Sequence, residues 1–209
     1  MQHIIPSDFG FDLNHARVAT LPILGDKITL RKYLEENGKA GKIHWTAVTT
    51  GPFLDWGLAT GFLGLDLKER KALIVGSGGE ENGVSMNLLS DVAKAIVGVL
   101  EAGEKVWDRA VLVRSAKVTA RELVAIAEKV GGGKWEVVEK GEEEVREDGL
   151  KKGRDGDKFG AFTGVIRSVM WGEGWGSGFE PTDNELLGVT ELDGEGLEGL
   201  VRGLLVVNE

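Results

Sequence analysis

The chain contains no cysteine, which excludes disulfides, thiolate zinc sites, iron–sulfur clusters and cysteine nucleophiles. Its three histidines, His3, His15 and His44, have no metal-ligand spacing, and we expect each to be structural. No apolar run is long enough to span a bilayer, and residues 1–20 lack the basic-then-apolar pattern of a secretory signal. These absences predict a soluble cytoplasmic protein without a metal site.

Positive charge is in the minority, with 25 Lys and Arg against 34 Asp and Glu, for a net charge of -9. Such a chain is repelled by phosphate backbones and by anionic membrane surfaces, so neither nucleic acid nor a membrane is an expected partner. The composition, 42% hydrophobic and 28% charged, is ordinary for a globular protein of one large or two small domains. The sequence leaves the oligomeric state open.

One stretch near the N-terminus organises the rest of the chain. It contains a predicted strand at His3–Ile5 that ends in Pro6–Gly10, and a predicted helix at Leu21–Asn37. A second predicted strand, Ile43–Val48, then opens into Gly51–Phe53. Because ligands of open α/β sheets bind beyond the carboxyl ends of parallel strands, these two strand ends mark a candidate site.

The predicted helix carries a lysine on its apolar side. One reading is that Lys27 extends its ammonium to water at the edge of the core, and the pattern alone favours this. The other reading is that a pocket partly desolvates the amine and lowers its pKa, leaving a donor or acid near neutrality. The apolar positions around Lys27 are Ile23, Leu24, Ile28, Leu30 and Leu34.

A glycine-rich segment, Gly76–Gly79, follows a predicted strand at Lys71–Val75 and at first resembles a phosphate cradle. Glu80 and Glu81 would place two negative charges where a pyrophosphate lies, and no helix begins directly after the glycines. We therefore predict a turn.

The remaining segments alternate between predicted helices and strands. We expect a helix capped by Ser90 with Leu100 on its apolar face, a strand at Ala110–Val113, a capping box at Thr119–Glu122 that begins a helix ending at Gly131, a strand at Trp135–Val138, a solvated helix within 139–158, and helices at Phe162–Trp171 and Leu197–Val207.

Residues Ile4–Gly10 (IIPSDFG) resemble the segment (R/H)-(F/I)-(I/L)-P-S-(D/E)-F-G of the NmrA-like and isoflavone-reductase-like family of atypical short-chain dehydrogenases. The match covers about residues 3 to 130 and fades between 139 and 185. The other blocks follow in the family's order: Pro22 with Lys27 and Arg31-Lys32, the strand end Val48–Phe53, Ile74–Gly78 followed by Ser90–Ala93, and Thr119–Glu122.

The resemblance implies an α/β fold, namely an incomplete Rossmann-type (doubly wound parallel) sheet plus a smaller α+β substrate-binding domain. On this basis we expect residues 1–70 to be the C-terminal part of a Rossmann-like NAD(P)-binding domain. Residues 71–209 would form the substrate-binding domain, with segments that can return to the Rossmann sheet. The implied activity is NADP(H)-dependent reduction of a small aromatic or carbonyl metabolite.

The resemblance also implies site residues. In the enzymatic members, the lysine matched by Lys27 lies near the nicotinamide ribose and the substrate and is regarded as catalytic or substrate-orienting. The positions matched by Pro6, Ser7 and Phe53 line the nicotinamide pocket, although Ser7 is equally explained by turn chemistry. Tyr33 cannot belong to a Tyr-x-x-x-Lys pair because residue 37 is Asn37.

Two departures from the family pattern affect the function. The family's first strand, its GxxGxxG turn and its basic residue for the 2′-phosphate precede the matched region, so we expect a truncated chain that binds NADP(H) weakly on its own. It would act as an oxidoreductase when the N-terminal half is present. The alternative is a non-catalytic nucleotide-sensing regulator of the NmrA type, or an inactive remnant. Gly51-Pro52 replaces an Asn-Cys pair of the plant reductases and points to the broader NmrA-like branch.

Overall fold

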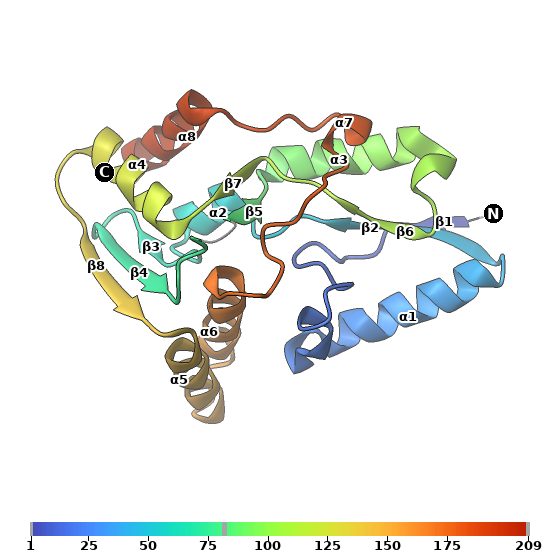
Figure 1. Cartoon of the computed structure of the whole chain (residues 1–209), viewed down its shortest axis with the longest axis horizontal. Coiled ribbons are helices and arrows are strands. Elements are labelled where there is room, and N and C mark those ends of the chain that lie inside the picture. Colours follow the sequence, from blue (N-terminus) through green and yellow to red (C-terminus); the bar gives the residue numbers. More distant parts are fainter. Residues whose placement is uncertain (1, 81–82, 208–209) are drawn as a thin grey trace.

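The structure, a computed structural model, describes residues 2–80 and 83–207. Strands β1 (Gln2–Ile4), β2 (Ile43–Thr49) and β6 (Arg109–Leu112) form a three-stranded parallel sheet in the order β1-β2-β6. Figure 1 shows α1 (Gly25–Lys39) on one face of this sheet and α3 (Leu89–Ala102) on the other. Parallel strands with helices on both faces confirm the predicted α/β class.

Two smaller groups of strands lie beyond the main sheet. β4 (Lys71–Val75) pairs with β3 (Leu65–Asp66) in antiparallel and with β8 (Glu136–Lys140) in parallel orientation. β5 (Val84–Met86) and β7 (Ala116–Val118) form an antiparallel pair. The predicted strands 71–75, 110–113 and 135–138 thus correspond to β4, β6 and β8. β6 pairs with β2, so a segment from beyond residue 70 lies in the β1-β2-β6 sheet. The predicted domain boundary between residues 70 and 71 stays a prediction.

Most of the helices agree with the sequence prediction. The predicted capping box is present, since the Thr119 side chain accepts from Glu122 N and the Glu122 side chain accepts from Thr119 N. The remaining helices are α2 (Leu54–Ala59), α4 (Ala120–Gly131), α5 (Glu142–Arg154), α6 (Lys158–Trp171), α7 (Asn184–Leu187) and α8 (Gly194–Val207), with 3₁₀ turns at Val18–Thr20, Pro22–Leu24 and Gly103–Val106.

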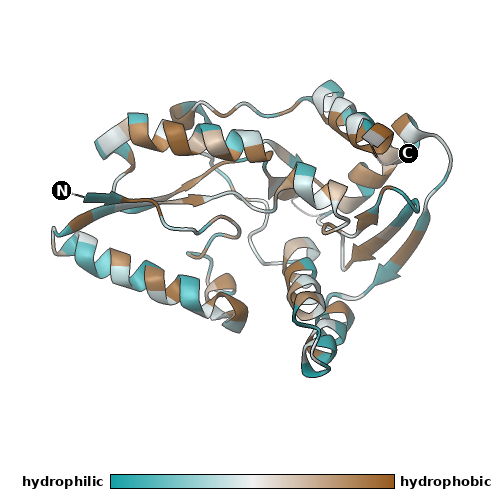
Figure 2. Cartoon of the chain, turned by 180° about the vertical axis from the view of Figure 1, so that it is seen from behind, coloured by the Kyte–Doolittle hydropathy of each residue, from teal (hydrophilic) through white to brown (hydrophobic). Residues whose placement is uncertain are grey.

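The start and the buried face of α3 correct two predictions. Ser90 does not cap the helix, because α3 begins one residue earlier, where the Asp55 carboxylate accepts from the Leu89 N–H at 3.1 Å. Leu100 is 63% exposed, because the helix instead packs through Gly98. A Cβ there would lie 2.5 Å from the Leu187 carbonyl oxygen, so only glycine allows α7 to come this close. Figure 2 shows α3 as one of the more hydrophobic helices.

The boundaries and the buried face of α1 also differ from the prediction. The helix runs from Gly25 to Lys39 and is preceded by the two 3₁₀ turns, rather than beginning at Leu21. Leu30 is 43% exposed, whereas Arg31 is only 5% exposed. The reason is local: Arg31 forms an ion pair with the buried Asp8, and this pair occupies the face that was assigned to Leu30.

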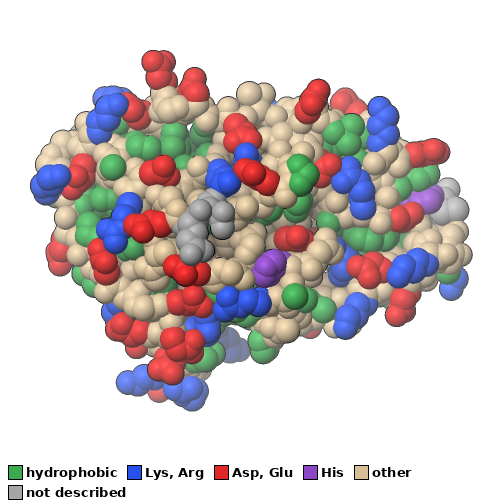
Figure 3. Space-filling view, viewed as in Figure 1, with side chains coloured by type: hydrophobic (Ala, Val, Ile, Leu, Met, Phe, Trp, Pro, Cys, Tyr) green, Lys and Arg blue, Asp and Glu red, His purple; other side chains and the backbone are tan. Residues whose placement is uncertain are grey.

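Helices α5 and α6 form a hairpin in which two glycines meet. A Cβ on Gly164 would lie 2.7 Å from the Gly149 Cα and 3.0 Å from the Val145 carbonyl oxygen. As predicted, α5 is solvated; acidic residues fill its first turn and basic residues its last, which suits the helix dipole. Figure 3 shows side chains of both charges on this projecting end. Within the described residues, every helix is too short or too polar to cross a bilayer.

We expect Gly164→Ala to lower the free energy of unfolding by about 1–3 kcal/mol, because the added methyl group overpacks the α5–α6 contact. The matched control is Gly203→Ala in α8, where nothing lies within 4 Å of the added Cβ. This control should raise the stability by up to about 1 kcal/mol through helix propensity. Urea denaturation followed by tryptophan fluorescence measures both, and equal effects would contradict the close contact.

Candidate functional site

A backbone hydrogen bond joins the loops that follow the carboxyl ends of β1 and β2. After β1 the chain turns, with Asp8 N donating to Pro6 O at 2.8 Å, and Gly51 N then donates to Gly10 O at 2.8 Å. Gly51 has φ 62, and a Cβ there would lie 1.9 Å from the Ser85 carbonyl oxygen. Only glycine is compatible with this approach. The structure therefore brings the two predicted strand ends together.

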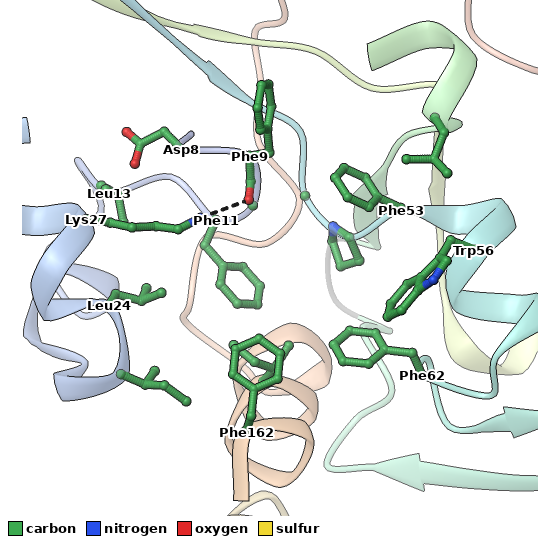
Figure 4. A pocket seen from close by; sticks show the side chains of 16 residues that line it. Asp8, Phe9, Phe11, Leu13, Leu24, Lys27, Phe53, Trp56, Phe62 and Phe162 are labelled. Atoms are coloured by element: carbon green, nitrogen blue, oxygen red, sulfur yellow. Dashed lines mark hydrogen bonds between the residues drawn. The ribbon is translucent and has the colours of Figure 1, made fainter. Parts of the chain in front are cut away.

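A cavity of about 520 Å³ lies at this junction, between α1 and α6. Figure 4 shows rings from four separate parts of the chain directed towards it. Two ring contacts connect its walls, Trp56 with Phe62 at 5.0 Å and Phe62 with Phe162 at 6.2 Å between centroids. The lining residues are Asp8, Phe9, Gly10, Phe11, Leu13, Ile23, Leu24, Lys27, Gly51, Pro52, Phe53, Trp56, Phe62, Leu89, Phe162 and Ile166.

Among the residues that the structure describes, Lys27 is the one cationic side chain that lines this cavity. Its amine donates to the Phe9 carbonyl oxygen at 3.2 Å, the bond drawn in Figure 4. Burial lowers the pKa of the Lys27 amine, and the nearby Asp8 carboxylate partly opposes this shift. This is the environment that the second reading of the sequence describes, while a catalytic role for Lys27 stays a prediction.

Asp8 and Arg31 form a buried ion pair next to the cavity, with exposed fractions of 4% and 5%. The Arg31 guanidinium also lies over the Trp45 ring, 5.0 Å from its centroid. No sequence motif predicts a function for this pair. A signal was present, because Lys27 and Arg31 are four residues apart on one helix and both fall in the matched family block.

The other predicted site residues have different positions. Phe53 lines the cavity, as the resemblance implies. Pro6 is buried and Ser7 is exposed, and neither lines the cavity, so contact with a cofactor stays a prediction for both. Tyr33 is 59% exposed on α1, and its carbonyl accepts from the Asn37 side chain.

A buried polar network that the sequence analysis missed supports the end of β2. The Asn87 side-chain amide donates to the carbonyl oxygens of Thr50 and Val113, each at 2.6 Å. Ser115 donates its hydroxyl hydrogen to the Asp91 carboxylate at 2.6 Å. Asp91 belongs to the matched Ser90–Ala93 block, and this match was the one sign in the sequence that Asp91 has a structural role. The network fixes the backbone just before Gly51.

The loop that follows β1 ends near Arg17, which contacts the segment that follows α6. Arg17 donates to the Glu173 carbonyl oxygen at 2.7 Å, and its guanidinium lies 4.0 Å from the Trp175 ring centroid. Arg146 approaches the same ring at 5.3 Å. Arg17 and Arg146 therefore both contact Trp175, and Arg17 links the end of the loop that carries Phe11 to the segment after α6.

The glycine-rich segment 76–79 forms the predicted turn, with Gly78 N donating to Val75 O at 2.9 Å. This segment does not line the cavity. Of Glu80 and Glu81, whose charges argue against a phosphate cradle, Glu81 lies outside the described residues. His3 and His44 bind Thr46 and Asp108, away from the cavity. Among the described residues, no three ligating side chains are grouped to hold a metal ion.

The parallel sheet, its flanking helices and the cavity at the strand ends are features of a Rossmann-like α/β fold. No protein-family model matches the sequence. The chain is 27% identical over 151 residues to oxidoreductase poxI of Penicillium oxalicum, covering 69% of this chain and 47% of the relative.

Two solved structures share the fold over nearly the whole chain. One is AtPrR2 with NADP+ and (+)pinoresinol, with a TM-score of 0.71 and 18% identity over 98% of this chain and 65% of that one. The other is isoflavone reductase, with a TM-score of 0.65, 18% identity and the same coverages. These likenesses confirm, for the fold, the resemblance that the motifs indicate. The chain spans about half the length of the curated relative and about two thirds of these structures.

We expect the cavity to bind a small planar aromatic such as 2-naphthol, and Phe162→Ala to weaken this binding about two- to tenfold. The loss of one ring contact is worth about 0.5–1.5 kcal/mol. Phe159→Ala is the matched control, since Phe159 lies on the same helix but is 67% exposed and does not line this cavity. Titration calorimetry compares the two variants, and an equal loss would show that the probe binds elsewhere.

Proposed function

We propose that this chain forms the substrate-binding part of an NADP-dependent reductase that acts on a small aromatic or carbonyl metabolite. One observation carries the proposal: an aromatic-lined cavity at the carboxyl ends of two parallel strands is lined by the amine of Lys27, whose pKa is lowered by burial. The relatives support the cofactor, because one is named an oxidoreductase and another is a complex with NADP+.

The lining residues suit the nicotinamide end of such a cofactor. An uncharged ring in the cavity would be flanked by Pro52 and aromatic side chains, among them the predicted Phe53, while the predicted Pro6 and Ser7 precede Asp8 without lining the cavity. Among the described residues Lys27 is the single cation that lines the cavity, which is little positive charge for a pyrophosphate. NADPH supplies a hydride when it is bound.

Lys27 supplies the complementary group. An apolar wall excludes water and strengthens the attraction between the ammonium and a substrate oxygen that gains negative charge. The Phe9 carbonyl oxygen holds one N–H of the amine, which leaves its other hydrogens for the substrate. A lowered pKa makes the ammonium a stronger acid, so Nζ can both orient the substrate oxygen and donate a proton to it.

We expect Lys27→Met to reduce kcat for NADPH-dependent reduction of aromatic ketones and quinones by about 100-fold or more, as for the loss of a general acid. The affinity for NADPH should change little. The assay follows NADPH absorbance, for the chain alone and for the chain fused to the part of isoflavone reductase that it does not cover. In the active form, kcat should fall as pH rises through the lowered pKa of Lys27. Equal losses in turnover and in cofactor affinity would remove Lys27 from the chemistry.

A second prediction concerns the cofactor. Because Lys27 alone among the described lining residues provides positive charge, we expect the chain by itself to bind NADPH weakly or not at all. A fluorescence titration that gave micromolar affinity would contradict this expectation. The fused form should bind NADPH; binding without any reduction of aromatic ketones or quinones would favour the alternative of a nucleotide-sensing regulator.

A further inference from the structure

Two cations and one carboxylate meet at the edge of the cavity. Lys27 and Arg31 lie one turn apart on α1, so their side chains share one face of the helix. Asp8, on the loop after β1, is close enough to influence both. Across residues 2–80 and 83–207, no other carboxylate forms an ion pair with either cation.

Arg31, rather than Lys27, holds this carboxylate. The ion pair is almost fully buried, and the guanidinium is further fixed by the Trp45 ring and by the Asn14 side-chain oxygen at 3.4 Å. In Figure 4 the Asp8 carboxylate is turned away from the centre of the cavity. The Lys27 amine is directed instead to the carbonyl of Phe9, the residue that follows Asp8.

We propose that Arg31 is a positioning residue for Lys27: by holding the Asp8 carboxylate, it leaves the Lys27 amine bonded to a backbone carbonyl and without a carboxylate partner. This inference rests on the proposed function, which gives Lys27 a substrate to act on. Arg31 itself does not line the cavity, so it acts through Asp8 and the loop.

The physical consequence is electrostatic. A carboxylate in direct contact with the amine would favour the ammonium and raise its pKa, whereas a neutral carbonyl does so much less. Asp8 and Arg31 are the charged groups that face Lys27 from the loop and from α1. From α2 and α6, the described residues that line the cavity wall have apolar side chains, among them Trp56, Phe162 and Ile166. Burial is the main cause of the lowered pKa of Lys27, and the pairing of Asp8 with Arg31 limits how far the carboxylate opposes it.

The test measures the pKa of Lys27 directly in the full chain without cofactor. The lysines are labelled by ¹³C reductive methylation and titrated by NMR, and Lys27→Arg identifies the resonance. Arg31→Gln should raise this pKa, because Asp8 becomes free to pair with Lys27. Asp8→Asn should lower it, because Arg31 is then an unpaired cation one turn away. The double variant should return to the wild-type value, and Arg31→Lys should keep it.

This sign pattern separates positioning from a purely structural role, which would move the pKa in one direction or not at all. Each pKa unit gained would reduce the free amine at a given pH about tenfold. Removing one partner of a buried pair costs about 3–5 kcal/mol, so either single variant can fail to fold, whereas the double variant leaves no unpaired charge. Whichever single variant folds is compared with the double variant, and Asp8→Asn should have a lower pKa of Lys27, or Arg31→Gln a higher one, than the double variant.

Equal Lys27 pKa values in wild type, Asp8→Asn and the double variant would overturn the proposal. This outcome is independent of reductase activity, since no substrate or cofactor enters the measurement. If the pKa pattern holds but Lys27→Met leaves turnover unchanged, the proposed function fails while the coupling of Arg31 to Lys27 stands.

Discussion

The cavity depends on the close approach of two backbone segments at the carboxyl ends of β1 and β2. The hydrogen bond from Gly51 to Gly10 joins them, and the space left by the absent side chain of Gly51 admits the Ser85 carbonyl. Asn87 holds the preceding residue, Thr50, from the other side. Because each segment is fixed by hydrogen bonds to its backbone, the aromatic side chains that follow can line a cavity without having to support the sheet themselves.

The sequence predicted the parts of the site that are local. The turn-forming Pro6–Gly10 and the glycine at position 51 both follow strands, and Lys27 stands out on an apolar helix face. It could not predict Phe162, whose ring meets that of Phe62 from a distance of 100 positions along the chain. Periodicity shows that a helix has an apolar face but does not show which other face it will meet.

Arg31, and not the expected Leu30, lies on the buried face of α1. The sequence could not show this for the same reason. Neighbouring positions on a helix differ by about 100° in direction, so both residues can be assigned to the edge of one apolar stripe. Hydrophobicity alone favours Leu30. The decisive factor is Asp8, a buried carboxylate on a different segment that requires a cation, and the long planar side chain of Arg31 reaches it. Such a requirement becomes visible only when the two segments are placed together.

The arrangement of these charges also bears on which of the two candidate functions we propose. A Rossmann-like fold hosts enzymes and sensors alike, so the fold does not decide between them. A sensor would need only shape and apolar contact from this cavity, and its stability would gain if Lys27 were paired with a carboxylate. Here the nearby carboxylate is held by Arg31, and the Lys27 amine is left partly buried with a neutral partner. Leaving an amine in this state is unfavourable for stability but useful for proton transfer, which favours the reductase.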